Sequence, residues 1–158
     1  MSASYLDGEI RQDGVGKFYL GWSMDKVIEN IDFEYEVKEF KNSIRLENEN
    51  ITFWFWKNKP VLQSIFLQGG YRGKLAKELG IGVAVEEIRD VKYIVPIGDV
   101  LFQYKLPEFS GVTFFPDFDK GAEDINIIGF INVYWCGQEI GDETVKDVNW
   151  GEERQMCP

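Results

Sequence analysis

Hydrophobic positions change their period shortly after Gly21. Met24, Val27, Ile28 and Ile31 fall at helical spacing, and Ser23 precedes them as a residue type that caps helix starts. This pattern predicts a short helix from Met24 to Ile31. The residues that follow are rich in β-branched and aromatic types and are broken by short turns, which predicts antiparallel strands. The four predicted strands are Glu34–Phe40, Ser43–Glu47, Ile51–Lys57 and Val61–Gln68.

The second half of the chain repeats this order of patterns. After Gly82, the apolar residues Val85 and Ile88 predict a second helix over residues 83–91. Strand-type segments follow it and are bounded by glycine and proline. They are Tyr93–Val95, Asp99–Lys105, Gly111–Pro116 and Ile125–Trp135. Weaker signals predict an edge strand at Lys17–Leu20, a helical tendency over Tyr71–Leu79 and a short strand at Glu143–Val148.

Two pairs of segments match at one offset of 61 residues. Gly21–Val27 and Gly82–Ile88 share the order glycine, large apolar, small, apolar, acidic, charged and β-branched. Ile51–Trp54 matches Val112–Phe115 at the same offset. Repetition at a fixed offset predicts a tandem duplication of one supersecondary unit. Two unrelated strand–turn–helix segments are the alternative.

The predicted fold class is α+β, with two tandem repeats that each pack a short helix on an antiparallel β-meander. The first repeat covers residues 1–70, and the second covers residues 71–158 and ends in an acidic tail. A lone unit of about 60 residues is marginally stable because it buries too little surface. We therefore expect the two repeats to form one compact unit in which each covers part of the other.

Composition and charge narrow the function. The chain has 158 residues, of which 44% are hydrophobic, and a formal net charge of −10 from 27 acidic and 17 basic residues. Such a surface repels phosphate backbones and anionic lipid, so we expect neither a nucleic-acid partner nor a membrane partner. There is no histidine, which excludes Ser-His-Asp and Cys-His triads and histidine-ligated zinc. We expect a protein that is not an enzyme and needs no cofactor.

Cysteine count and terminal pattern suggest a compartment. Cys136 and Cys157 are the two cysteines, too few for a disulfide framework or a zinc ligand set. The first residues lack the cationic start and apolar stretch of a secretion signal, and no apolar run reaches the 18–20 residues that span a bilayer. We therefore expect a cytoplasmic protein with both thiols reduced.

Acidic residues are concentrated in the C-terminal third. Residues 117–124 carry a net charge of −3 and residues 137–158 carry −4, together −7 of the total of −10. The first segment has the Asp-x-Asp-x-Gly order of a calcium loop, but Ile128 stands at the twelfth position where such loops place glutamate. A solvated hairpin loop and an acidic hairpin tip aimed at a basic cleft are the other interpretations. We expect no metal site.

Aromatic residues beside these acids suit an interface with aromatic anchors and a charged rim. The alternative is that Trp135 belongs to the core and that the tail only promotes solubility. The predicted partner-binding residues are Asp117, Asp119, Glu123, Asp124, Trp135, Glu139, Asp142 and Glu143.

The helix-entry motif, present at Gly21–Val27 and again at Gly82–Ile88, resembles that of the β-lactamase-inhibitor protein architecture. It is also similar to the related single-copy lipoproteins of outer-membrane assembly. The resemblance implies a helix followed by a β-meander, present twice. This chain lacks the signal peptide and the paired cysteines of the secreted inhibitors, so β-lactamase inhibition is not carried over.

A second resemblance rests on properties. A small, acidic, aromatic-rich α+β chain without catalytic groups resembles bacterial toxin-immunity proteins of the contact-dependent-inhibition and polymorphic-toxin type. It implies binding to a cognate toxin, most simply a basic nuclease whose active cleft an acidic protein can cover. The alternatives are a non-catalytic scaffold module of a membrane-assembly type and, last, an enzyme that uses carboxylates. Oligomeric state stays open.

Overall fold

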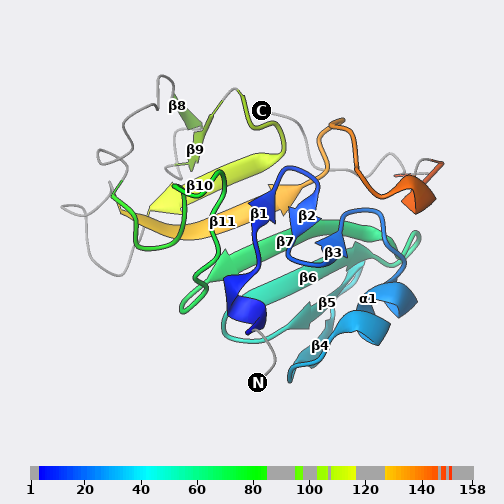
Figure 1. The fold of residues 1–158 in the computed structure, drawn as a ribbon. Coiled ribbons are helices and arrows are strands. Elements are labelled where there is room, and N and C mark those ends of the chain that lie inside the picture. Colours follow the sequence, from blue (N-terminus) through cyan, green and yellow to red (C-terminus); the bar gives the residue numbers. More distant parts are fainter. Residues whose placement is uncertain are drawn as a thin grey trace.

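The structure is a computed structural model of the chain, and it describes residues 4–84, 95–97, 103–106, 108–116, 127–145, 147–148 and 150. The described chain is mostly β, with two antiparallel sheets and one α-helix, which is consistent with the α+β class. Figure 1 shows a large sheet with a small sheet and the helix beside it.

The large sheet has eight strands in the order β4-β5-β6-β7-β11-β10-β9-β8. Each half of the chain forms a four-stranded meander, and the two meanders join through their last strands. In the first half these are β4 (Glu36–Glu39), β5 (Ser43–Glu47), β6 (Ile51–Trp56) and β7 (Leu62–Gln68). In the second they are β8 (Val95–Ile97), β9 (Gln103–Lys105), β10 (Val112–Pro116) and β11 (Ile128–Tyr134). The four strands predicted between Glu34 and Gln68 are thus confirmed, Ser43–Glu47 with the same bounds and the other three with slightly shorter ones.

One face of this sheet carries the core. Phe53 and Phe55 on β6 are fully buried, as are Ile65 and Leu67 on the neighbouring β7. Because side chains alternate along a strand, Trp54 and its neighbours on β6 point to the opposite face, where they are half-buried. The hydrophobic alternation of β6 therefore decides which face the helix covers.

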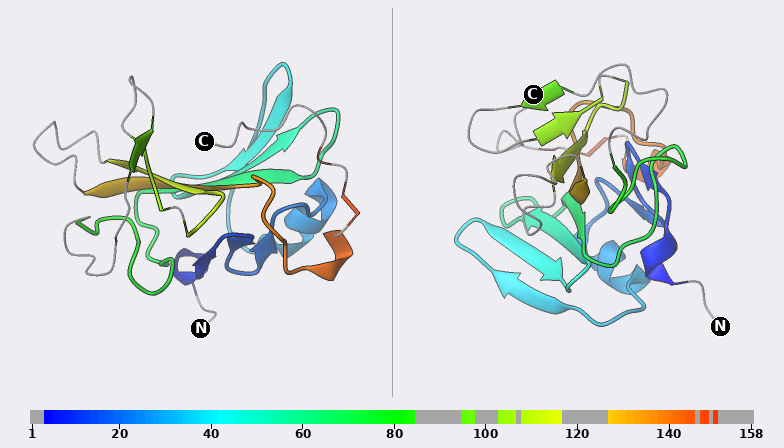
Figure 2. Two further views of the ribbon diagram at one scale, coloured as in Figure 1. Left: turned by 90° about the horizontal axis from the view of Figure 1, so that it is seen from above. Right: turned by 90° about the vertical axis from the view of Figure 1, so that its left-hand side faces the viewer.

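α1 (Met24–Asn30) begins where the sequence predicts it. The Oγ atom of Ser23 accepts a hydrogen bond from the backbone N–H of Lys26 at 3.2 Å, and Asp25 lies in the first turn, where the helix dipole favours an acid. Val27 is fully buried against the sheet. The three-stranded sheet lies on the same face of the large sheet as α1 (Figure 2).

The small N-terminal sheet was only partly expected. Its strands are β1 (Ile10–Arg11), β2 (Gly14–Val15) and β3 (Phe18–Tyr19), preceded by the 3-10 helix η1 (Tyr5–Asp7). The sequence predicted only the last of these strands, because two-residue strands leave almost no period to detect. The sheet is tied to the body by Tyr71, whose hydroxyl donates to the carbonyl of Gly8 at 2.6 Å.

Two sequence-based predictions are wrong. Residues 71–79 are not helical: Ala76 and Lys77 have left-handed φ angles of 52° and 65°, which interrupt any helix. The strand predicted at Glu143–Val148 is instead the 3-10 helix η5 (Glu143–Val145). Its start is stabilised by Asp142, whose carboxylate accepts from the backbone N–H of Thr144 at 2.9 Å.

The two helix-entry glycines have the same local geometry. Gly21 and Gly82 both have a φ of +87°. The N–H of Gly21 donates to the carbonyl of Leu62 at 2.9 Å, and that of Gly82 donates to Ile128 at 2.7 Å, so each is anchored at the start of the last strand of its meander. The helix predicted over residues 83–91 lies almost entirely outside the described residues, so the tandem repeat stays a prediction.

The expectation that both thiols are reduced is wrong for Cys136, which is disulfide-bonded. The only other cysteine in the sequence is Cys157, which lies outside the described residues. The bond was not expected because the number and spacing of cysteines do not show which chain segments meet in the fold. Disulfides are rare in cytosolic proteins, so the bond does not support the cytoplasmic location, which remains a prediction. In the described part of the chain, no helix has the length and apolar character needed to span a membrane.

Candidate functional site: an acidic cleft beside the edge strand

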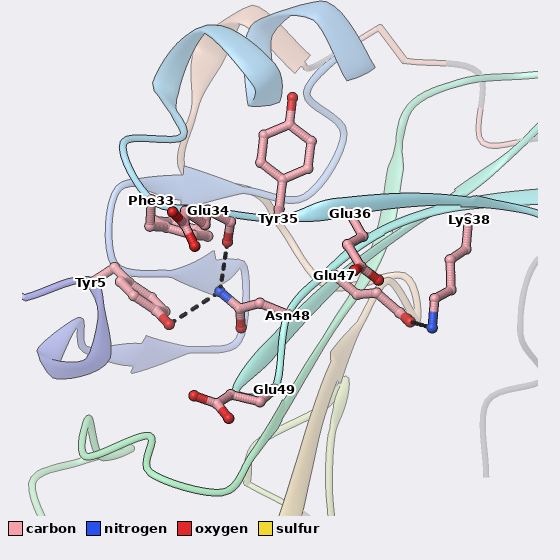
Figure 3. A pocket seen from close by; sticks show the side chains of 9 residues that line it. All are labelled: Tyr5, Phe33, Glu34, Tyr35, Glu36, Lys38, Glu47, Asn48 and Glu49. Atoms are coloured by element: carbon pink, nitrogen blue, oxygen red, sulfur yellow. Dashed lines mark hydrogen bonds and ion pairs between the residues drawn. The ribbon is translucent and has the colours of Figure 1, made fainter.

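An open cleft of about 1030 Å³ lies where the segment after α1 runs into β4. We call it the acidic cleft. Its walls come from η1, from the α1–β4 connection, from β4 and from the turn between β5 and β6 (Figure 3). The lining residues are Tyr5, Phe33, Glu34, Tyr35, Glu36, Lys38, Glu47, Asn48 and Glu49.

Its floor is held by aromatic stacking and amide hydrogen bonds. The rings of Tyr5 and Phe33 stack with centroids 4.0 Å apart. The side-chain amide of Asn48 donates to the Tyr5 hydroxyl and to the carbonyl of Glu34, both at 3.1 Å (Figure 3). Asn50 donates to the same hydroxyl at 3.2 Å. Three chain segments are therefore fixed around one tyrosine before any ligand binds.

Four carboxylates surround this floor and one lysine opposes them. Glu47 forms an ion pair with Lys38 at 2.8 Å, and this contact with a carboxylate raises the pKa of Lys38. Among the described residues, Glu34, Glu36 and Glu49 have no cationic partner within ion-pair distance, and all three are exposed. The cleft therefore presents three unneutralised carboxylates next to aromatic rings.

This arrangement suits cationic side chains from a protein partner. Arginine or lysine gains from the carboxylates and from the faces of nearby aromatic rings, and an open cleft admits side chains carried on a folded surface. In the described residues, no group of three or more acidic or cysteine side chains is placed to hold a metal ion. The unpaired carboxylates give the cleft a local negative charge that attracts cationic groups.

Of the partner-binding residues predicted from the sequence, half lie outside the described residues: Asp117, Asp119, Glu123 and Asp124. Trp135 is half-buried and stacks on Trp150 with ring centroids 4.5 Å apart and an interplanar angle of 1°. Glu139 and Glu143 are exposed. The partner-binding role of these residues stays a prediction.

Asp142 has an internal role. Its carboxylate accepts a hydrogen bond from the indole N–H of Trp22 and lies 3.6 Å from the Lys26 ammonium. The Trp22 bond, followed by the bonds from Thr144, lowers the pKa of Asp142 to about 2. This carboxylate fixes the C-terminal segment to the start of α1, so a partner would reach it only in addition to these contacts.

The acidic cleft was missed at the sequence level, although a signal exists. Residues 32–36 alternate acid and aromatic, Asp-Phe-Glu-Tyr-Glu, and residues 47–50 read Glu-Asn-Glu-Asn. The first stretch overlaps the start of the strand predicted from Glu34, and the second spans the end of the strand predicted at Ser43–Glu47 and the turn after it. Their approach depends on Tyr5, which lies more than forty positions before Asn48.

Neither a protein-family model, nor a curated protein, nor a solved structure matches this chain.

Proposed function

We propose that this protein is a non-catalytic immunity protein that binds a cognate bacterial toxin and neutralises it by covering its active cleft. The toxin class we infer is a basic nuclease of the contact-dependent or polymorphic type. A nuclease must attract polyanions, so its active cleft is positively charged, and an acidic protein of complementary shape can occupy that cleft.

The single observation that carries the proposal is the acidic cleft. Its three unpaired carboxylates stand on a floor already fixed by the stacking of Tyr5 on Phe33 and by the amide of Asn48. A fixed floor reduces the entropy lost on binding, and unpaired charge accelerates encounter with a basic partner. The acidic C-terminal segment adds to the same long-range field.

The proposed architecture is a tandem pair of helix-plus-meander repeats that form one platform. The identical φ of Gly21 and Gly82 supports this, and so does their common anchoring to the last strand of each meander. The matched segments that begin at Ile51 and Val112 start the third strand of their respective meanders. Such a platform would present the acidic residues on a rigid support.

The test begins with recovery of the partner. Immobilised protein should capture one basic polypeptide from lysate of cells that carry the neighbouring genes, and stoichiometric addition should abolish its nuclease activity. A captured component of a membrane-assembly complex would favour the scaffold alternative. Turnover of a small substrate by this chain would favour the carboxylate enzyme.

Charge reversal then locates the surface. The triple variant Glu34→Lys, Glu36→Lys and Glu49→Lys should slow association with the captured toxin at least about tenfold at low salt and flatten its salt dependence, because steering depends on local charge. A matched variant with the same charge change elsewhere, Glu29→Lys, Glu78→Lys and Glu108→Lys, should retain most of the rate; all three residues are exposed and lie outside the cleft. Equal rates for the two variants would reject the acidic cleft.

The C-terminal acids are tested in parallel. Reversal of Asp117, Asp119, Glu123 and Asp124 to lysine should also slow association if the predicted hairpin tip contributes to the interface. Unchanged kinetics at low salt would remove that segment from the interface while leaving the acidic cleft in place. Stopped-flow fluorescence at several salt concentrations measures both sets of variants.

A further inference from the structure

β4 is the edge strand of the large sheet as far as the structure describes the chain. Among the described residues it pairs only with β5, and all four of its residues are exposed. Val37 is 59% exposed and is one of three large hydrophobic residues exposed in the described chain. The β4–β5 hairpin projects from the body of the molecule (Figure 2), so another strand has room to approach. An open edge of this kind is a template for strand addition.

The hairpin turn fixes which residues of β4 direct their backbone N–H and C=O groups toward β5 and which direct them outward. The N–H of Phe40 donates to the carbonyl of Ser43 at 2.8 Å, and the register continues with Lys38 opposite Arg45 and Glu36 opposite Glu47. Hydrogen-bonded and non-hydrogen-bonded pairs alternate along an antiparallel ladder. The backbone groups of Glu36 and Lys38 therefore point to β5, and those of Val37 and Glu39 point to the open side.

The charges on this edge are poorly matched within the monomer. Glu36 stands directly opposite Glu47, and Lys38 stands directly opposite Arg45. Like charges in directly opposed positions destabilise a sheet. The diagonal ion pair between Lys38 and Glu47 relieves this only in part, since Glu36 has no cationic partner among the described residues. An added strand would relieve it if it placed a lysine beside Glu36 and a glutamate beside Lys38.

β4 itself has that order of charges when it runs antiparallel to a second copy. We propose that two copies of this chain pair through β4 about a two-fold axis at Val37. Val37 then faces Val37 of the second copy, and the outward backbone groups of the two valines bond to each other. Glu36 of each copy faces Lys38 of the other, in the non-hydrogen-bonded positions where side chains come closest. The contact is isologous, as a two-fold dimer requires.

The proposal does not require the toxin assignment, but the two share Glu36: in the dimer this carboxylate pairs with Lys38 of the second copy, and Glu34 and Glu49 stay unpaired in each cleft. A two-fold axis perpendicular to the sheet keeps the same face of both copies on one side. The acidic clefts of the two copies, which include Glu36 and Lys38, would then lie next to each other on that side. One dimer would present both clefts in a single acidic surface.

Charge exchange on one strand tests the proposal. Glu36→Lys places two lysines opposite each other across the two-fold axis, and Lys38→Glu places two glutamates there. Each single variant should weaken self-association at least about tenfold, because two attractive pairs become repulsive. In the monomer's own ladder a lysine at position 36 faces Glu47 and a glutamate at position 38 faces Arg45, although Lys38→Glu also removes the diagonal ion pair with Glu47. Unchanged thermal unfolding at low protein concentration checks this.

Mixing supplies the decisive experiment. The Glu36→Lys and Lys38→Glu proteins should each sediment as monomers alone and form a one-to-one dimer together, since every opposed pair is then complementary. The double variant in one chain should recover the dimer. Analytical ultracentrifugation gives the masses, and hydrogen exchange at the Val37 amide should slow only in dimeric samples.

Three results would overturn the proposal. The unaltered chain could remain monomeric at all concentrations, the single variants could still dimerise, or their mixture could fail to do so. Protection of the Val37 amide only in the presence of a foreign polypeptide would assign the edge to another partner.

Discussion

Asp142 ties the C-terminal segment to the start of α1 through a single carboxylate. The folded protein holds its pKa at about 2, against an ordinary value of 3.8, because the Trp22 indole and Thr144 donate to the ionised form. A lowered pKa means that the contribution to stability is complete above the ordinary pKa and is lost as pH falls toward 2. The side chain is 14% exposed, so solvent moderates the effect.

We predict that Asp142→Asn lowers the free energy of unfolding by about 1–2 kcal/mol near neutral pH, the size of a partly exposed hydrogen bond to a charged group. The difference between the variant and the unaltered chain should shrink as pH falls from 4 to 2, because the carboxyl group of the unfolded chain takes up its proton first and the native carboxylate does so only near pH 2. Urea unfolding followed by tryptophan fluorescence measures it. A difference that is constant across this range would mean that the charge of Asp142 does not matter.

At the scale of single residues, the sequence predicted only contacts between residues that are close in the chain. Ser23 was identified as a cap because its partner, Lys26, lies three residues away. The bond between Trp22 and Asp142 spans 120 residues, and no periodic pattern connects them. The same holds for Tyr5 and Asn48 in the acidic cleft. Residue types suggested what each side chain can do, but not which partner it meets.

The helix-entry turns are the elements on which the proposed repeat depends. Gly21 and Gly82 share a φ of +87°, a region that side-chain-bearing residues adopt at a cost of about 1–3 kcal/mol. Their surroundings differ. A Cβ added at Gly21 would lie 3.1 Å from the Cβ of Val145, whereas one at Gly82 meets no atom of the described residues within 4 Å. A side chain is therefore unfavourable at both positions because of the backbone conformation, and at Gly21 it also meets packed neighbours.

We therefore predict that Gly21→Ala and Gly82→Ala both destabilise the protein, and that Gly21→Ala has the larger effect because η5 must also shift. Gly137→Ala is the matched control: its φ is +84° and an added Cβ again meets no atom within 4 Å in the described part of the chain, so its cost should equal that of Gly82→Ala. Thermal unfolding ranks the three. Equal losses at all three positions would show that packing against Val145 is irrelevant.

Elements whose hydrophobic pattern extends over several residues were predicted well, and very short elements were not. The helix after Ser23 and the first four strands of the large sheet follow from hydrophobic spacing that extends over at least four residues. The helix prediction for residues 71–79 was wrong because apolar spacing alone does not reveal the left-handed backbone at Ala76 and Lys77. The 3-10 turn after Asp142 was assigned to a strand for a similar reason: a side-chain bond to Thr144 overrides the propensity of Thr144 and Val145.

At the scale of the molecule, the pairing of β7 with β11 decides how the chain closes. Every other pairing in the large sheet joins strands that are consecutive in sequence, whereas this one sets Gln68 opposite Phe130. The sequence predicted two meanders, but not which strands would join them, because each meander has two edge strands, β4 and β7 in the first and β8 and β11 in the second. That choice required the three-dimensional structure.

The same feature sets an order of events during folding. Closing a long loop costs more entropy than forming a hairpin, so local ribbons on either side gain their hydrogen bonds before the central seam can. Pulse-labelled hydrogen exchange should find amides at the β5–β6 turn protected earlier than those shared by Ile65 and Val133. If both sets became protected together, the seam would belong to the nucleus. If the two halves form first, the newly made protein exposes the unpaired edges of β7 and β11 until they pair. Aggregation is most favourable during that interval.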